Sequence, residues 1–258
     1  MINIDDVRLA SERLKGVIKR TPFTYATQLS DICGTEVFIK KENLQNTGAF
    51  KLRGAFNKIS TLREEEKKNG VIAASAGNHA QGVAFSASHF GIKSYIVMPE
   101  STPLLKVNGT KELGAEVILH GNSYDEAYAY AQNYANKHHI TFIHPFADEM
   151  VMAGQGTIAL EMLEDIKELD IIVVPVGGGG LISGIAVAAK AIKPDIKVIG
   201  VSASGAPAMR NSFLAKSQQD SLFVKTIADG IAVRDTAKET FDYILKFVDD
   251  IVEVDDEE

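Results

Sequence analysis

Short apolar runs rich in Val and Ile alternate with helix-length segments along most of the chain. The runs that read as strands are 36–42, 70–76, 94–100, 115–121, 140–146, 171–178, 197–203 and 242–248. Apolar runs of this length, bounded by turn residues, are typical of buried strands, and strands separated by helix-length segments favour parallel pairing. We therefore predict an α/β fold of parallel-rich sheets with helices on both faces.

Two helices can be placed from spacing and caps. Val7, Ala10, Leu14 and Val17 recur at helical spacing after two aspartates, and Pro22 prevents continuation soon afterwards. A second helix is predicted to begin at Ser123, because a glutamate three residues later completes a capping box.

The last ten residues contain a strand-like run, 249–254, and then four acidic residues, 255–258. Acidic residues are typical of the first turn of a helix, so we expect a helix to begin there and the sequence to be a piece of a longer protein.

The formal charge of −7 argues against a partner with a phosphate backbone, so we expect no nucleic acid. No apolar segment is long enough to span a membrane, and the acidic N-terminus does not resemble a secretory signal. Cys33 is the only cysteine, which excludes an internal disulfide and leaves packing as its expected role. We expect a protein of the cytoplasm.

Lys51 lies in the segment NTGAFKLRGA (46–55), after an aromatic residue and among small ones. A lysine that forms a Schiff base needs a lowered ammonium pKa, which burial, the neighbouring Arg53 or a bound cofactor could supply. A solvated surface lysine is the commoner role, and the segment alone leaves both open.

A polar turn follows the predicted strand 70–76, in the segment GVIAASAGNHAQGVA (70–84). Ligands bind at the carboxyl ends of strands in open α/β sheets, and helix N-termini present free N–H groups to anions. Ser75, Asn78 and His79 thus lie where a carboxylate could bind, although they could equally serve as helix caps.

Four consecutive glycines, Gly177, Gly178, Gly179 and Gly180, join the apolar run at 171 to a helix-like segment. A tight turn needs only one or two glycines, so the run indicates backbone N–H groups that wrap a phosphate. No Gly-Lys-Ser/Thr follows, which excludes an ATP-type loop, and the dinucleotide fingerprint also fails for lack of its third glycine. A single phosphate group fits best.

The lysine segment, the Asn/His turn and the tetraglycine loop, in this order, resemble the fold-type II pyridoxal-phosphate enzymes (tryptophan synthase β-like). The resemblance spans essentially the whole chain and is greatest to the catalytic domain of the threonine dehydratases, or threonine ammonia-lyases. Its most specific pieces are KKENLQNTGAFKLRGAFNK, SAGNHAQGVA, MAGQGTIALEM, VPVGGGGLISGIA and TIADGIAV.

The resemblance implies a lyase that uses pyridoxal 5'-phosphate to eliminate water from L-threonine or L-serine, giving 2-oxobutanoate or pyruvate and ammonia. Such an enzyme serves isoleucine biosynthesis or threonine catabolism. Lys51 would carry the cofactor and remove the substrate α-proton, Phe50 would lie against the pyridine ring, and Asn78 would bind the ring hydroxyl. The other implied contacts are Gly177, Gly178, Gly179, Gly180, Leu181 and Gly230 for the cofactor, and Ser75, Ala76, Asn78 and His79 for the substrate.

Three departures from related patterns bear on this expectation. Family members continue into a further C-terminal stretch that carries a Ser or Cys facing the pyridine nitrogen, so the activity of this chain alone is open. Ala76 stands where serine racemases have a second acid/base, which favours elimination because an alanine cannot move a proton. Residues 202–208 contain no carboxylate where the racemases bind a divalent cation, so we expect no metal there.

The alternatives are a serine racemase or serine dehydratase, a cysteine-synthase-like β-replacement enzyme and, from another class, a non-catalytic relative that binds pyridoxal phosphate or a nucleotide. The resemblance also implies two domains, a large one of residues 1–52 and 148–258 and a small one of residues 53–147. We expect a homo-oligomer, either a dimer or a tetramer.

Overall fold

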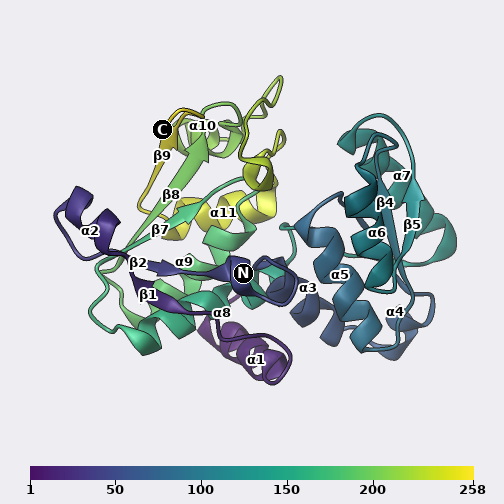
Figure 1. Ribbon diagram of the computed structural model, residues 1–258, viewed down its shortest axis with the longest axis horizontal. Coiled ribbons are helices and arrows are strands. Elements are labelled where there is room, and N and C mark those ends of the chain that lie inside the picture. The colour runs from purple at the N-terminus through teal and green to yellow at the C-terminus, as the bar shows by residue number, and fades with distance from the viewer.

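The computed structural model describes residues 1–258, which form two parallel sheets and one short antiparallel pair (Figure 1). The sheet orders are β5-β4-β3-β6, β7-β8-β9 and β1-β2. The strands are β1 Phe23–Tyr25, β2 Phe38–Lys40, β3 Val71–Ala74, β4 Ser94–Met98, β5 Glu116–Leu119, β6 Thr141–Phe142, β7 Ile171–Pro175, β8 Lys197–Ala203 and β9 Asp250–Val254.

At least one α-helix lies between every two consecutive strands, as expected for the parallel pairing in the two larger sheets. The α-helices are α1 Ile4–Leu14, α2 Thr27–Cys33, α3 Lys51–Ser60, α4 Glu64–Lys68, α5 Asn78–His89, α6 Leu104–Glu112, α7 Tyr124–His138, α8 Glu149–Asp165, α9 Gly180–Ile192, α10 Ala208–Ala215 and α11 Lys238–Phe247. Two short 3-10 helices are η1 Glu42–Leu44 and η2 Asp229–Ile231.

The four-stranded sheet is covered on both faces. Val71 and Ala73 of β3 pack into a core with side chains of α3 and α5, whereas Ile72 and Ala74 pack with α7 on the other side. This division follows from the alternation of side chains along a strand, and all four β3 residues are fully buried because helices lie on both sides.

The three-stranded sheet packs one face onto the largest core, which also contains residues of α1, α8, α9 and α11. Ile172 and Val174 of β7 belong to this core. The alternate residues Ile171 and Val173 are 55% and 63% exposed, so this face of β7 is uncovered.

Several sequence expectations differ from the structure. Residues 242–248 lie mainly in α11 and not in a strand, because Phe241, Ile244 and Val248 are buried at helical spacing. Cys33 is exposed at the end of α2 and does not pack in a core. Residues 255–258 form no helix; instead the Asp255 carboxylate accepts the backbone N–H groups of residues 257 and 258.

Other expectations are confirmed. The strand at 249–254 is β9, and Ser123 caps α7 by accepting the backbone N–H of Glu126. α1 forms as predicted, although its cap is Asn3 and its last residue is Leu14. No helix is long and apolar enough to cross a bilayer. The division into residues 1–52 with 148–258 and residues 53–147 stays a prediction.

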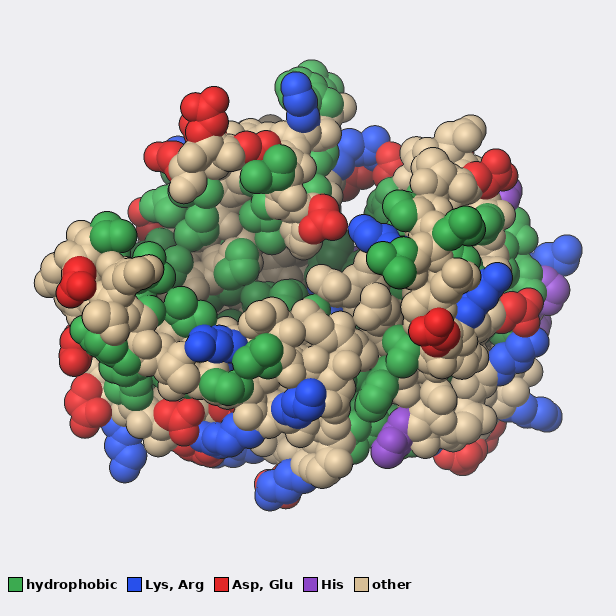
Figure 2. All heavy atoms as spheres, in the orientation of Figure 1, with side chains coloured by type: hydrophobic (Ala, Val, Ile, Leu, Met, Phe, Trp, Pro, Cys, Tyr) green, Lys and Arg blue, Asp and Glu red, His purple; other side chains and the backbone are tan.

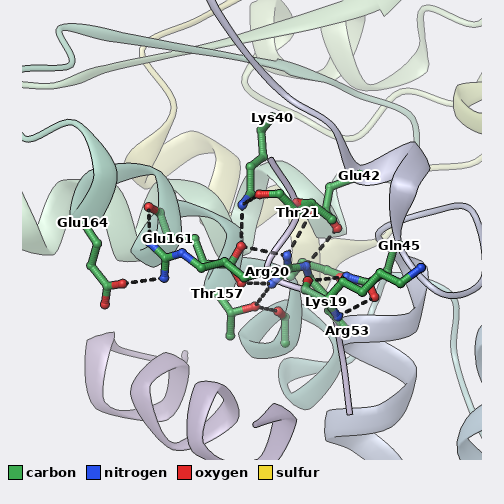
Figure 3. A network of polar contacts seen from close by, with 12 residues as sticks. Lys19, Arg20, Thr21, Lys40, Glu42, Gln45, Arg53, Thr157, Glu161 and Glu164 are labelled. Carbon is green, nitrogen blue, oxygen red and sulfur yellow. Dashed lines mark hydrogen bonds and ion pairs between the residues drawn. The ribbon is translucent and has the colours of Figure 1, made fainter. Parts of the chain in front are cut away.

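A buried ion network ties α3 to α8 and η1 (Figure 3). The Arg53 side chain has no exposed surface, and its five N–H groups donate to Glu42, Glu161 and Thr157 at 2.6–3.1 Å. Lys40 also binds Glu161, so two cations and two carboxylates balance one another. Because every guanidinium donor has an acceptor, the buried charge is compensated.

Helices α8 and α9 approach so closely that their contact surface must be glycine. A Cβ built on Gly184 would lie 2.0 Å from the carbonyl oxygen of Met152, and one on Gly156 would lie 2.7 Å from the carbonyl oxygen of Gly184. Backbone atoms cannot move aside as a flexible side chain can, so α9, which begins at the tetraglycine loop, is held at a fixed distance from α8.

Gly184→Ala is therefore expected to lower the free energy of unfolding by about 3 kcal/mol through overpacking. Gly109→Ala is the matched control, because a Cβ at this position in α6 meets nothing within 4 Å, and alanine should be neutral or stabilise the helix by up to about 1 kcal/mol. Urea denaturation of both variants measures the difference, and equal midpoints would contradict the packing argument.

Candidate active site

The tetraglycine loop connects the carboxyl end of β7 to the first turn of α9. From Gly177 to Ile182, no backbone N–H donates a hydrogen bond to another group of the protein. Gly179 has a φ of +87°, a conformation that side-chain-bearing residues rarely adopt. The loop therefore presents six successive free donors at the positive end of a helix dipole, which makes it a candidate anion site.

Protein packing also requires these glycines. A Cβ on Gly177 would lie 2.9 Å from the Cα of Ile231, and a Cβ on Gly178 would lie 2.5 Å from the ring of Phe146. The sequence argument attributed the glycine run to ligand access alone. In the structure, neighbouring protein atoms occupy part of the space that side chains would need.

A pocket joins this loop to the start of α3. Figure 2 shows a hollow near the middle of one face, with green hydrophobic side chains and tan atoms, but no charged side chain, on its floor. Of the nine residues predicted to bind the cofactor, all except Asn78 line one pocket. The lining residues are Phe50, Lys51, Phe146, Pro175, Gly177, Gly178, Gly179, Gly180, Leu181, Gly230, Ile231 and Val233.

Lys51 is the only titratable residue of this lining, and it is the first residue of α3. Its ammonium donates to the carbonyl oxygen of Pro145 at 2.9 Å and lies 5.4 Å from the centre of the Phe50 ring, with no carboxylate paired to it. Burial lowers the pKa of Lys51 to about 8. Arg53 does not contribute, because its charge is matched by carboxylates in the ion network.

The Asn/His turn follows the carboxyl end of β3 and leads into α5. The backbone N–H groups of Asn78, His79 and Ala80 donate to no protein group, so the start of α5 is a second potential anion site. The Asn78 side chain is exposed, Ala76 is half-buried, and the Ser75 hydroxyl accepts the N–H of Gly77.

The α5 helix packs on the start of α3, with Gly82 against the backbone of Lys51. His79 is nevertheless only 3% exposed, and its Nε2 donates to the carbonyl oxygen of Ile143 at 2.9 Å, while Nδ1 has no partner. Burial, with the nearby charge of Lys51, lowers the pKa of His79 to about 3. The ring is therefore neutral, and a substrate carboxylate would meet the backbone N–H of His79 and not an imidazolium.

The sequence argument missed the segment between β6 and α8. Its Pro145 carbonyl accepts from Lys51, its Phe146 lines the pocket, and His144 holds the turn between them. A signal was present, because the predicted strand 140–146 ends in His-Pro-Phe, and ligands gather at the carboxyl ends of parallel strands.

The chain belongs to a family described as pyridoxal-phosphate dependent enzymes, whose model matches residues 14–258. An L-threonine ammonia-lyase of Thermotoga maritima is 51% identical over 100% of this chain and 64% of its own length. A catabolic L-threonine dehydratase of Staphylococcus aureus is 44% identical over 100% of this chain and 75% of its own length.

Solved structures agree with this family. A serine racemase of maize superposes with a TM-score of 0.95 at 37% identity, over 99% of this chain and 77% of the racemase. A threonine deaminase of Solanum lycopersicum gives a TM-score of 0.93 at 39% identity, over 98% of this chain and 69% of the deaminase. The chain thus spans about two thirds to three quarters of the length of these relatives.

The lowered pKa of Lys51 can be measured in the cofactor-free protein. We expect its acetylation rate, followed by mass spectrometry of the Lys51 peptide, to rise with pH about a midpoint near 8, because only the neutral amine reacts. Lys246, an exposed lysine of α11 that is not desolvated, is the internal control for the reactivity of the reagent. Coincident profiles for the two lysines would contradict the burial argument.

Proposed function

We propose that this chain carries the catalytic site of a threonine ammonia-lyase, which eliminates water from L-threonine, and also from L-serine, with pyridoxal 5'-phosphate as cofactor. The names of the relatives from Thermotoga maritima and Staphylococcus aureus support the reaction. The observation that carries the proposal is the pocket in which Lys51, with its lowered pKa, faces a loop of free N–H groups.

The pocket residues fit this cofactor. The phosphate would accept the free N–H groups of the loop Gly177–Leu181, which present no side chain before Leu181. Phe50 would lie beside the ring. A Cβ on Gly230 would meet no protein atom within 4 Å, so this wall of the pocket leaves room for a flat ring. Asn78, whose side chain is exposed and bonded to no protein group, would reach the ring hydroxyl.

Lys51 supplies the base. With a pKa of about 8, roughly a tenth of the side chain is the neutral amine at pH 7, against fewer than about one in a thousand for an ordinary lysine. The neutral form can attack a carbonyl and can accept a proton from Cα, and burial is what makes it available.

The other residues orient the substrate. The backbone N–H groups at the start of α5 would bind its carboxylate, and Ser75 would stand beside them. The cofactor, when bound, supplies an electron sink for the charge that develops at Cα. Ala76 offers no proton to the face of Cα opposite Lys51, so racemisation lacks the second acid that it needs. Elimination of the β-hydroxyl is then the reaction that yields product.

We also propose that the protein works in the cytoplasm as a homo-oligomer, a dimer or a tetramer. The single cysteine supports a reducing compartment.

Reduction with borohydride tests the role of Lys51. The pyridoxyl group should be recovered on the Lys51 peptide, and Lys51→Ala should lower elimination from L-threonine by about 10³-fold or more, because the variant lacks the base. Lys246→Ala on the surface of α11 is the control and should keep the parent activity. Recovery of the label on another lysine would refute the assignment.

The products formed from L-serine test the role of Ala76. With L-serine as substrate, we expect pyruvate and no appreciable D-serine, because the face of Cα opposite Lys51 lacks a proton donor. Ala76→Ser should introduce some D-serine if this position alone withholds it. D-serine formed by the parent at a rate comparable to pyruvate would favour the serine racemase alternative.

A further inference from the structure

Residues 143–147, in the segment between β6 and α8, touch each of the three predicted motifs. The Ile143 carbonyl accepts from His79 of the Asn/His turn, and the Pro145 carbonyl accepts from Lys51. The Phe146 ring lies against the tetraglycine loop, where a Cβ on Gly178 would come within 2.5 Å of it. The backbone path of this short segment therefore determines which groups lie next to the Lys51 amine.

His144 holds this path through one atom. Its Nδ1 accepts the backbone N–H of Ala147 at 2.8 Å and that of Phe146 at 3.2 Å, and neither N–H bonds to a backbone carbonyl. An acceptor that serves the N–H groups two and three residues ahead closes a turn. The turn places the Pro145 carbonyl, which lies inside it, toward α3.

The Pro145 carbonyl is the one hydrogen-bond acceptor that Lys51 has in the structure. A buried ammonium without an acceptor is strongly disfavoured, so the position of this oxygen also determines where the amine rests. It keeps the Lys51 amine in the pocket lined by the glycine loop.

Burial keeps the His144 ring neutral. It is contacted by the aromatic rings of Tyr128 in α7, Phe142 in β6 and Phe146. Burial lowers its pKa to about 4; Asp148, the N-cap residue of α8, and Glu239 of α11 act in the opposite direction, and Lys51 of α3 acts with burial. At neutral pH, Nδ1 therefore keeps the lone pair that both N–H groups require.

We propose that His144 is a positioning residue: its Nδ1 fixes the turn at residues 145–147, so that the Pro145 carbonyl holds the Lys51 amine beside the glycine loop. The inference rests on the proposed role of Lys51 as the cofactor-bearing lysine. It adds a residue that acts on this lysine only through a backbone carbonyl.

The experiment compares His144→Leu with His144→Asn in the cofactor-free protein. Leucine has no acceptor, so the turn opens and the Lys51 ammonium loses its carbonyl partner. The midpoint of the Lys51 acetylation profile should then fall by about one pH unit, because burial without an acceptor disfavours the charged form. The asparagine oxygen can accept the same two N–H groups, so His144→Asn should keep the parent midpoint.

His89→Leu is the matched control, because His89 is an exposed histidine that packs edge-on against Phe56 and Phe90 and takes no part in the turn. Its midpoint should equal that of the parent. An unchanged or raised midpoint in His144→Leu, or the same shift in His144→Asn, would overturn the proposal. Because the profile reports the amine whether or not it ever carries a cofactor, this outcome is independent of the proposed function.

A measurement on the unchanged protein covers the case in which His144→Leu does not fold. Nitrogen NMR of the His144 ring should show the proton on Nε2 and a neutral ring down to about pH 4. A proton on Nδ1, or titration near the ordinary histidine value of about 6.5, would overturn the proposal, since Nδ1 could not then accept the two N–H groups.

Discussion

The fully buried guanidinium of Arg53 is the constraint on which the site depends. Its five donors are shared between Glu42 beside β2 and Glu161 and Thr157 of α8. Removing one partner would leave an uncompensated buried charge, at a cost of about 3–5 kcal/mol, whereas the complete network is balanced. Elements far apart in sequence are therefore held together around α3, and Lys51, two residues before Arg53, begins this helix.

The same network keeps the charge of Arg53 from affecting the pKa of Lys51. The Arg53 guanidinium lies close to Lys51 in sequence, yet its field is cancelled by the carboxylates of Glu42 and Glu161. Burial alone thus accounts for the lowered pKa of Lys51. Without its carboxylate partners, the Arg53 guanidinium would have lowered the pKa of Lys51 further. An unpaired carboxylate near Lys51 would have raised this pKa.

The sequence was sufficient to predict the parallel strands and the glycine loop, because both depend on local patterns. Phe50, Leu181 and Gly230 were predicted only from the family resemblance, and Phe146 of the pocket was not predicted. Runs such as 70–76 and 171–178 lead directly into turns rich in glycine, and the strand ends are where a parallel sheet binds ligands. The helix at 242–248 was misread as a strand because its apolar residues include three in a row. The roles of Arg53 and His144 were not predictable, since the partner Glu161 lies 108 residues from Arg53 and the His144 tautomer depends on a turn.

The two candidate anion sites, the glycine loop and the start of α5, consist of uncharged groups, and this matters for the lysine. The free N–H groups of the glycine loop and of the start of α5 carry only partial charges, and His79 and His144 are held neutral. Cationic side chains in these positions would bind a phosphate or a carboxylate more tightly, but each would also repel the Lys51 ammonium. Because backbone N–H groups are the hydrogen-bond donors here, Lys51 is the only titratable group of the pocket lining. Its pKa then remains close to neutral pH, where a lysine can both attack a carbonyl and exchange a proton.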